Sequence, residues 1–111
     1  MDSKQKARYE AQAGIIKALA HPSRLFIVEE LNRQKRCVSE LTEMIGVDTS
    51  TVSKHLGILK NAGLVLHEKK GTTVYYQLRM PCLLDFINCV ESVMEANALG
   101  QMETVISCKI K

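Results

Sequence analysis

The stretch of residues 38–66 constrains the fold of this chain most, because its pattern predicts two short helices joined by a tight turn. In the first helix, apolar residues recur at helical spacing, and Ser39 is the expected N-cap. The second helix is expected to begin at Thr49, behind a cap at Asp48. Its predicted inward-facing residues are Val52, Leu56 and Leu59. The segment 39–62 is therefore predicted to be a helix-turn-helix.

The outer face of the second helix carries small hydrogen-bonding side chains and a cation in its first turns. A helix that enters the major groove of DNA needs donors and acceptors for base edges, a cation for phosphate and little bulk. For the two helices taken alone, an ordinary corner of an all-α domain is the alternative. The residues predicted to face DNA are Thr49, Ser50, Thr51, Ser53 and Lys54, with His55 near a phosphate.

After Gly63 the apolar pattern changes from helical to alternating, which predicts a β-hairpin over residues 64–78. Lys69 and Lys70 are predicted to lie at its turn and, with Thr73, to contact phosphates. Two alternatives are a solvated hairpin whose lysines prevent edge aggregation, and a winged helix that binds protein. The second alternative is expected to have an uncharged wing. A basic hairpin directly after the second helix favours DNA binding by a winged helix.

A further helix is predicted between Pro22 and Gln34, upstream of the helix-turn-helix. Pro22 suits the first position of such a helix, and the residues predicted to face inward are Leu25, Val28 and Leu31. A basic loop with Lys35 and Arg36 is expected to follow it.

Two more helices are predicted near the ends of the chain, over residues 4–20 and 81–98. Each carries an apolar stripe, and the two stripes exceed what a small core can cover. We therefore expect a homodimer in which these helices pair across a two-fold axis. Such a dimer separates its recognition helices by roughly 34 Å, which predicts an inverted-repeat operator. The predicted fold is mainly α with a β-hairpin wing: four helices, two strands and a last helix.

Length and composition limit the remaining possibilities. The 111 residues suit one modest core, so a single domain over residues 1–111 is predicted. The formal charge of +3 permits a nucleic-acid partner without requiring one. The apolar run 13–20 is too short and polar for a signal peptide or membrane span, which predicts a cytoplasmic protein without a membrane partner. In that compartment the cysteines are expected to be mainly reduced thiols.

Three segments of the chain resemble the ArsR/SmtB family of bacterial winged-helix repressors: ALAHPSRLFIVEEL, VSELTEMIGVDTSTVSKHLGILKNAGLV and KKGTTVYYQL. The resemblance covers about residues 13–95. It implies a homodimer that binds its operator in the ligand-free form and releases it when a metal, metalloid or thiol-reactive signal arrives.

The cysteines match the family's sensing motifs only in part. Arsenic and cadmium sensors of the family often carry a C-V-C-[DE]-L box, whereas this chain has CVSEL at residues 37–41. The last helix also lacks the His and Asp spacing of the family's zinc sensors, which disfavours zinc. Some arsenic sensors of the family have thiols near the start of that helix, as Cys82 and Cys89 are here. An ideal helix separates these two sulfurs by about 10 Å along its axis, so binding one ion requires an unwound first turn or a thiol from the other subunit.

Soft thiolates without clustered histidines favour trivalent arsenic, antimony or another soft metal ion as the inducer. The candidate ligands are Cys82, Cys89, Cys37 and Cys108. Oxidation or persulfidation of the Cys82 and Cys89 pair is an alternative, and an inert buried thiol is the alternative for each single cysteine. A thiol oxidoreductase would need an activated cysteine with a resolving partner at short spacing, and none is evident. No enzyme activity and no cofactor for folding are expected.

Overall fold

The computed structural model describes residues 1–100, so Cys108 lies outside the described residues. Residues up to Arg79 form one compact unit, called here the first unit, and the chain from Met80 onward forms a second. Each unit is described by itself, and the single-domain organisation stays a prediction.

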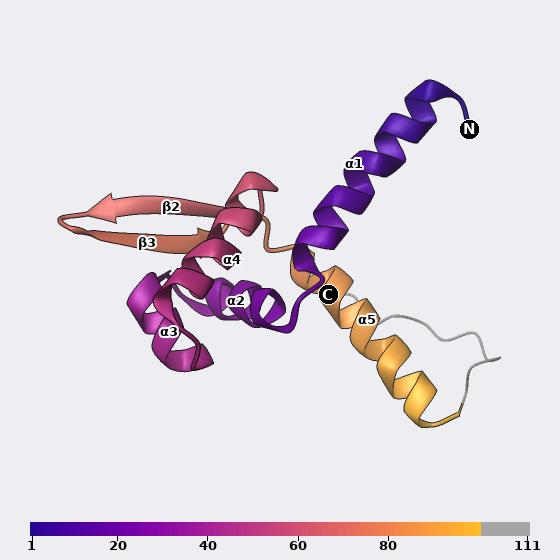
Figure 1. The fold of residues 1–111 in the computed structure, drawn as a ribbon. Coiled ribbons are helices and arrows are strands. Elements are labelled where there is room, and N and C mark those ends of the chain that lie inside the picture. The colour runs from indigo at the N-terminus through magenta and orange to yellow at the C-terminus, as the bar shows by residue number, and fades with distance from the viewer. Residues whose placement is uncertain (101–111) are drawn as a thin grey trace. The chain divides into compact units, whose positions relative to one another are not determined.

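The elements of the first unit follow the predicted order with one addition (Figure 1). They are α1 (Ser3–Leu19), α2 (Pro22–Arg33), β1 (Arg36–Cys37), α3 (Val38–Ile45), α4 (Thr49–Asn61), β2 (Val65–Lys70) and β3 (Thr73–Leu78). The second unit contains α5 (Leu83–Ala98). This arrangement confirms the predicted mainly helical fold with a β-hairpin after the helix-turn-helix.

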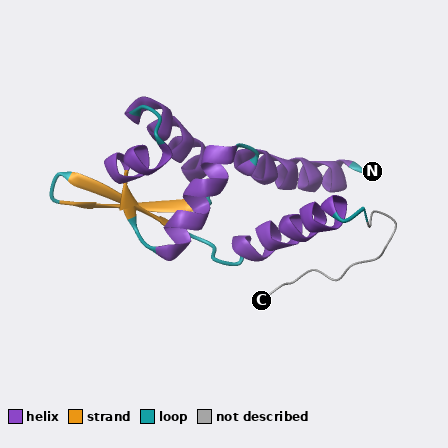
Figure 2. Cartoon of the chain, turned by 90° about the horizontal axis from the view of Figure 1, so that it is seen from below, coloured by secondary structure: helices purple, strands orange, loops and turns teal. Residues whose placement is uncertain are grey.

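The added strand, β1, occupies what the sequence analysis predicted to be a basic loop. It pairs antiparallel with β3, with Arg36 opposite Tyr76 and Cys37 opposite Tyr75, so the sheet has the order β1-β3-β2 (Figure 2). Two residues are too few to produce a detectable alternation of polar and apolar side chains. Only pairing with a strand far along the chain reveals β1.

The turn of the β2–β3 hairpin lies directly after Lys69 and Lys70, the two lysines predicted to form it. Its last paired residues are Lys70 and Thr73, which leaves Gly71 and Thr72 as a two-residue loop. Gly71 has a φ of 64°, and such loops favour positive φ at their first central position. Lys69 and Lys70 are therefore the last two residues of strand β2 and do not form the turn.

The core of the first unit lies among α2, α3, α4 and the base of the hairpin. Its fully buried large side chains are Ile27, Val28, Leu41, Val52, Leu56 and Leu59. The prediction for α4 is thereby confirmed, but the prediction that Leu25 faces inward is wrong, since Leu25 is 38% exposed. Leu25 lies two residues before Ile27, about 160° around the helix. Ile27 takes the inward position instead.

Helix α3 begins at Val38, two residues earlier than a cap at Ser39 would place its start. Its N-cap is Cys37, not Ser39, and the Cys37 backbone N–H donates to Oε1 of Glu40 at 3.0 Å. A glutamate three residues after the cap satisfies a backbone donor that the helix itself leaves unpaired. Ser39 therefore lies inside the first turn.

The last helix begins two residues later than the predicted start at Pro81. The N–H groups of Leu83 and Leu84 donate to the carbonyls of Met80 and Pro81, which forms a tight turn before α5. Gly100, with a φ of 71°, follows the end of α5, as expected for a helix-ending glycine. Among the described residues, no helix combines the length and apolar character needed to cross a bilayer.

Candidate nucleic-acid interface

Helix α4 turns its apolar side into the core, and the predicted DNA-facing residues lie on its other side. Thr49, Ser50, Ser53 and Lys54 are exposed, while Thr51 is half-buried. Because Val52, Leu56 and Leu59 have no exposed surface, rotation of α4 about its axis would disrupt the core. The helix therefore presents its hydroxyl-rich first turns to solvent in one fixed orientation.

Asp48 caps α4 as predicted. Its Oδ1 accepts the backbone N–H of Thr51 at 2.8 Å and the hydroxyl of Ser50 at 3.3 Å. Hydrogen bonds from Thr51, its side chain first, are the main reason that the pKa of Asp48 is lowered. The carboxylate thus fixes the first turn of α4 and orients one of the predicted base-contacting hydroxyls.

The structure contradicts the prediction that His55 lies near a phosphate. His55 is only 7% exposed, and its ring contacts other side chains of the first unit. Its Nδ1 lies 3.0 Å from Nη1 of Arg24, and its ring centroid lies 4.4 Å from that of His21. The physical reason is its position next to Leu56, on the buried side of α4.

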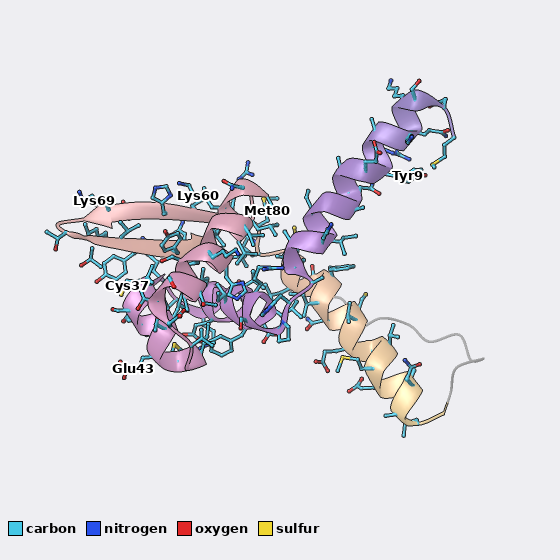
Figure 3. The ribbon with its side chains drawn as sticks, in the orientation of Figure 1. Tyr9, Cys37, Glu43, Lys60, Lys69 and Met80 are labelled. Carbon is cyan, nitrogen blue, oxygen red and sulfur yellow. The ribbon has the colours of Figure 1, made fainter. Side chains whose placement is uncertain are left out.

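The two wing lysines are exposed, but they point away from opposite faces of the hairpin. Successive residues of a strand alternate in direction, so Lys69 shares a face with His67, while Lys70 shares a face with Glu68. Figure 3 shows Lys69 toward the outer end of the hairpin. Thr73, opposite Lys70, is half-buried.

An ionic network connects the base of the sheet to the helix-turn-helix. Nε of Arg36 on β1 lies 2.8 Å from Oε2 of Glu30, a buried carboxylate of α2, and Nη1 of Arg36 lies 3.6 Å from Glu40 on α3. The hydrogen bond from Arg36 is the main reason that the pKa of Glu30 is lowered. Arg36, Glu40, Glu43 and Met44 line an open hollow of about 480 Å³. This network fixes β1 against α2 and α3.

Arg24 is a residue to which the sequence analysis gave no role. Its Nε donates to the backbone carbonyl of Ala18 at 2.7 Å, while its Nη1 faces His55. The contact with His55 joins positions 31 residues apart. No local pattern predicts such a contact.

The candidate thiols lie in different parts of the chain. Cys37 is half-buried, and its Sγ lies 3.4 Å from the hydroxyl of Ser39. Cys82 is exposed at the N-cap of α5, and its carbonyl accepts the N–H of Asp85, so the first turn of α5 is wound. Cys89 is half-buried within α5. Within the described residues, no three His, Cys, Asp or Glu side chains are grouped so that they could hold a metal ion.

Residues 21–66 match the family model described as "Bacterial regulatory protein, arsR family". The chain is 44% identical over 69 residues to the HTH-type transcriptional repressor SmtB of Mycobacterium tuberculosis, a match that covers 62% of this chain and 51% of that protein. It is 51% identical over 63 residues to the arsenical resistance operon repressor of Bacillus subtilis, covering 56% of this chain and 60% of that protein. The chain thus spans about half the length of the repressor SmtB.

Solved structures extend the similarity to the terminal helices. A homodimeric winged helix-turn-helix DNA-binding domain of Mycobacterium bovis has a TM-score of 0.76 and 26% identity, covering 95% of this chain and 97% of that one. The Rv0081 protein of M. tuberculosis has a TM-score of 0.72 and 31% identity, covering 86% of this chain and 96% of that one. These relatives are named as regulators or DNA-binding proteins, in agreement with the prediction that the chain is not an enzyme.

Proposed function

Because this chain belongs to the ArsR family of bacterial winged-helix regulators, we propose that it is a cytoplasmic transcriptional repressor that binds an inverted-repeat operator as a homodimer. One observation carries this proposal: the exposed, hydroxyl-rich start of α4 is fixed by a buried apolar face and by the Asp48 cap. Base edges in the major groove are read by side chains of this size and chemistry.

Two lysines on separate elements provide the test of DNA binding. Lys54 of α4 and Lys70 of β2 are both exposed and are proposed to neutralise one phosphate each. Each lysine-to-alanine variant is expected to bind operator DNA more weakly and to reduce the slope of log affinity against log salt by about one. The measurement is fluorescence anisotropy across a salt series, with Lys4→Ala near the start of α1 as the matched control. An unchanged slope in both variants would refute the proposed contacts.

The dimer proposal is supported by apolar side chains that are exposed in each unit. On α1, Ile15 and Ile16 are 42% and 50% exposed, and on α5, Val93 and Met94 are 57% and 56% exposed. Apolar surface of this kind commonly marks an interface with another protein. Ile16→Glu and Val93→Glu are each expected to give monomers by sedimentation velocity. Dimers that persist in both variants would contradict pairing through these helices.

We propose that a soft metal or metalloid ion such as trivalent arsenic is the inducer, and that Cys82 and Cys89 are its ligands. Thiolates suit such ions. The described residues of one chain add no third ligand to this pair, so we propose that the site is completed across the dimer. When bound, the ion supplies bonds between thiolates that favour a conformation unable to fit the operator. Cys37 is a weaker candidate because Ser39 stands where the family's C-V-C-[DE]-L box has its second cysteine. Cys108 lies outside the described residues.

A titration of the operator complex with arsenite, cadmium, zinc and a persulfide donor tests the inducer proposal. Arsenite is expected to release the wild-type protein and Cys37→Ser, but neither Cys82→Ser nor Cys89→Ser. Release by the persulfide donor alone would favour the second candidate function, a sensor of reactive sulfur through the same two thiols. A complex that survives every titration would refute sensing by these cysteines.

A further inference from the structure

A buried polar cluster joins α4 to two other helices of the first unit, and the DNA contacts proposed above do not use it. Nη1 of Arg24 on α2 lies 3.0 Å from Nδ1 of His55, which is 7% exposed. Nε of the same arginine donates to the carbonyl of Ala18 near the end of α1 at 2.7 Å. One guanidinium therefore connects α1, α2 and α4.

This contact determines the protonation state of His55. A guanidinium can only donate hydrogen bonds, so the imidazole nitrogen that faces Arg24 must accept one. Nδ1 of His55 is then unprotonated, and the neutral ring carries its proton on Nε2. A doubly protonated ring would instead direct an N–H at the guanidinium and bring two cations into contact. The observed geometry therefore requires neutral His55.

The charged groups around His55 are all basic. Burial is the main reason that the pKa of His55 is lowered from 6.5, and His21, Arg24 and Lys54 lower it further. His21 comes from the start of α2, where its Nδ1 accepts the N–H of Ser23 at 3.0 Å. From α1, the carbonyl of Ala18 accepts a hydrogen bond from Nε of Arg24. Among the described residues, no carboxylate of α3 or β2, which also pack on α4, acts on His55 to favour its charged form.

We propose that neutral His55, held by Arg24, positions α4 for the operator and that protonation of His55 releases the DNA. The inference rests on the proposed function, since it assigns a regulatory input to the same helix. His55 and Arg24 are positioning residues in this proposal: they act on DNA through α4. Protonation breaks the contact between His55 and Arg24, which joins α4 to α2 and, through the Ala18 carbonyl, to the end of α1. The loss of this contact allows α4 to shift.

The direction of the pH effect distinguishes this proposal from the general gain of positive charge in acid. Acid generally adds positive charge to a protein surface, which strengthens binding to phosphates. A buried histidine that must be neutral in the bound form has the opposite effect. Affinity is then full well above pH 6.5, the ordinary pKa of histidine, and decreases as the pH falls through the lowered pKa of His55.

The test uses the full chain and an operator duplex selected with it at about pH 7.5. Affinity is measured at about pH 7.5 and about pH 5.5 at constant ionic strength for wild type, His55→Gln and His67→Gln. Glutamine keeps an acceptor for Arg24 but does not titrate. We expect wild type and the exposed control His67→Gln to lose between about twofold and about tenfold in acid, since about tenfold is the upper limit for a histidine pKa of 6.5 and the pKa of His55 is lowered. His55→Gln is expected to lose less than about twofold. An equal loss in wild type and His55→Gln, or no loss in wild type, would overturn the proposal.

A second measurement needs neither DNA nor a variant. Backbone amide and histidine ring signals of the wild-type protein are followed by NMR across the same pH range. The α4 amides are expected to shift with the midpoint of the His55 ring, and α4 signals that stay constant through that titration would overturn the proposal. If the wild type binds no duplex at pH 7.5, the proposed function fails, whereas the NMR result still decides whether His55 controls α4.

Discussion

Helix α4 and the β2–β3 hairpin are both proposed to contact DNA, but the fold holds them differently. Three side chains of α4 are fully buried and its first turn is capped by Asp48. In β2, by contrast, every residue after Val65 is exposed, so this strand is held by pairing with β3 and by an ion pair between Glu68 and Lys35. Helix α4 therefore suits the readout of base edges, which needs a fixed helix, while the wing suits attraction to phosphates, which tolerates motion.

The largest expected difference between the two regions is in how far an alanine substitution lowers the free energy of unfolding. Leu56→Ala in α4 leaves a cavity under the helix and is expected to lower the free energy of unfolding by about 2–5 kcal/mol. Leu66→Ala in the wing, where the side chain is 45% exposed, is expected to change it by less than about 1 kcal/mol. Urea denaturation measures both. Similar losses would show that the wing is packed as tightly as α4.

An intermediate effect is expected on operator choice. Ser53→Ala removes an exposed hydroxyl of α4 and is expected to reduce the preference at one base pair by about 1 kcal/mol, roughly fivefold. Lys69→Ala in the wing is expected to weaken binding to all sequences alike. Selection from randomised duplexes measures both. A changed base preference in the wing variant, with none in Ser53→Ala, would reverse the assignment of roles.

The smallest expected effects come from two glycines, one in each region. Gly57 lies within α4, where an added Cβ meets no atom within 4 Å, so Gly57→Ala should raise the free energy of unfolding by about 0.5–1 kcal/mol. Gly71 of the wing turn has a φ of 64°, so Gly71→Ala should lower it by about 1 kcal/mol. Thermal unfolding compares the two. Equal signs would contradict the assigned backbone conformations.

Local signals were sufficient to predict much of this molecule. The buried side chains of α4 follow from helical spacing, and Asp48 was identified as a cap because a short acidic side chain precedes the helix. The change to an alternating apolar pattern after Gly63 predicts the hairpin, although its turn lies directly after Lys69 and Lys70 and does not include them. Each of these features depends on residues within a few positions of one another.

Other features required contacts between distant parts of the chain. Strand β1 exists because Arg36 and Cys37 pair with β3, and Glu30 is buried because Arg36 neutralises it. The inward position of Ile27 in place of Leu25 is also set by packing. Side-chain spacing in one helix does not determine which of its faces the neighbouring elements cover.

The helix-turn-helix, the hairpin and the chemistry of the exposed face of α4 follow from the amino-acid sequence, because period, caps and side-chain type are local properties. The burial of His55 against Arg24, in place of exposure to phosphate, follows from the packing of the folded chain. That contact joins α2 to α4 across 31 residues, and the packing of the helices sets it. Burial of an ionisable ring among cations is a property of the folded chain, since the unfolded chain leaves the same ring in water.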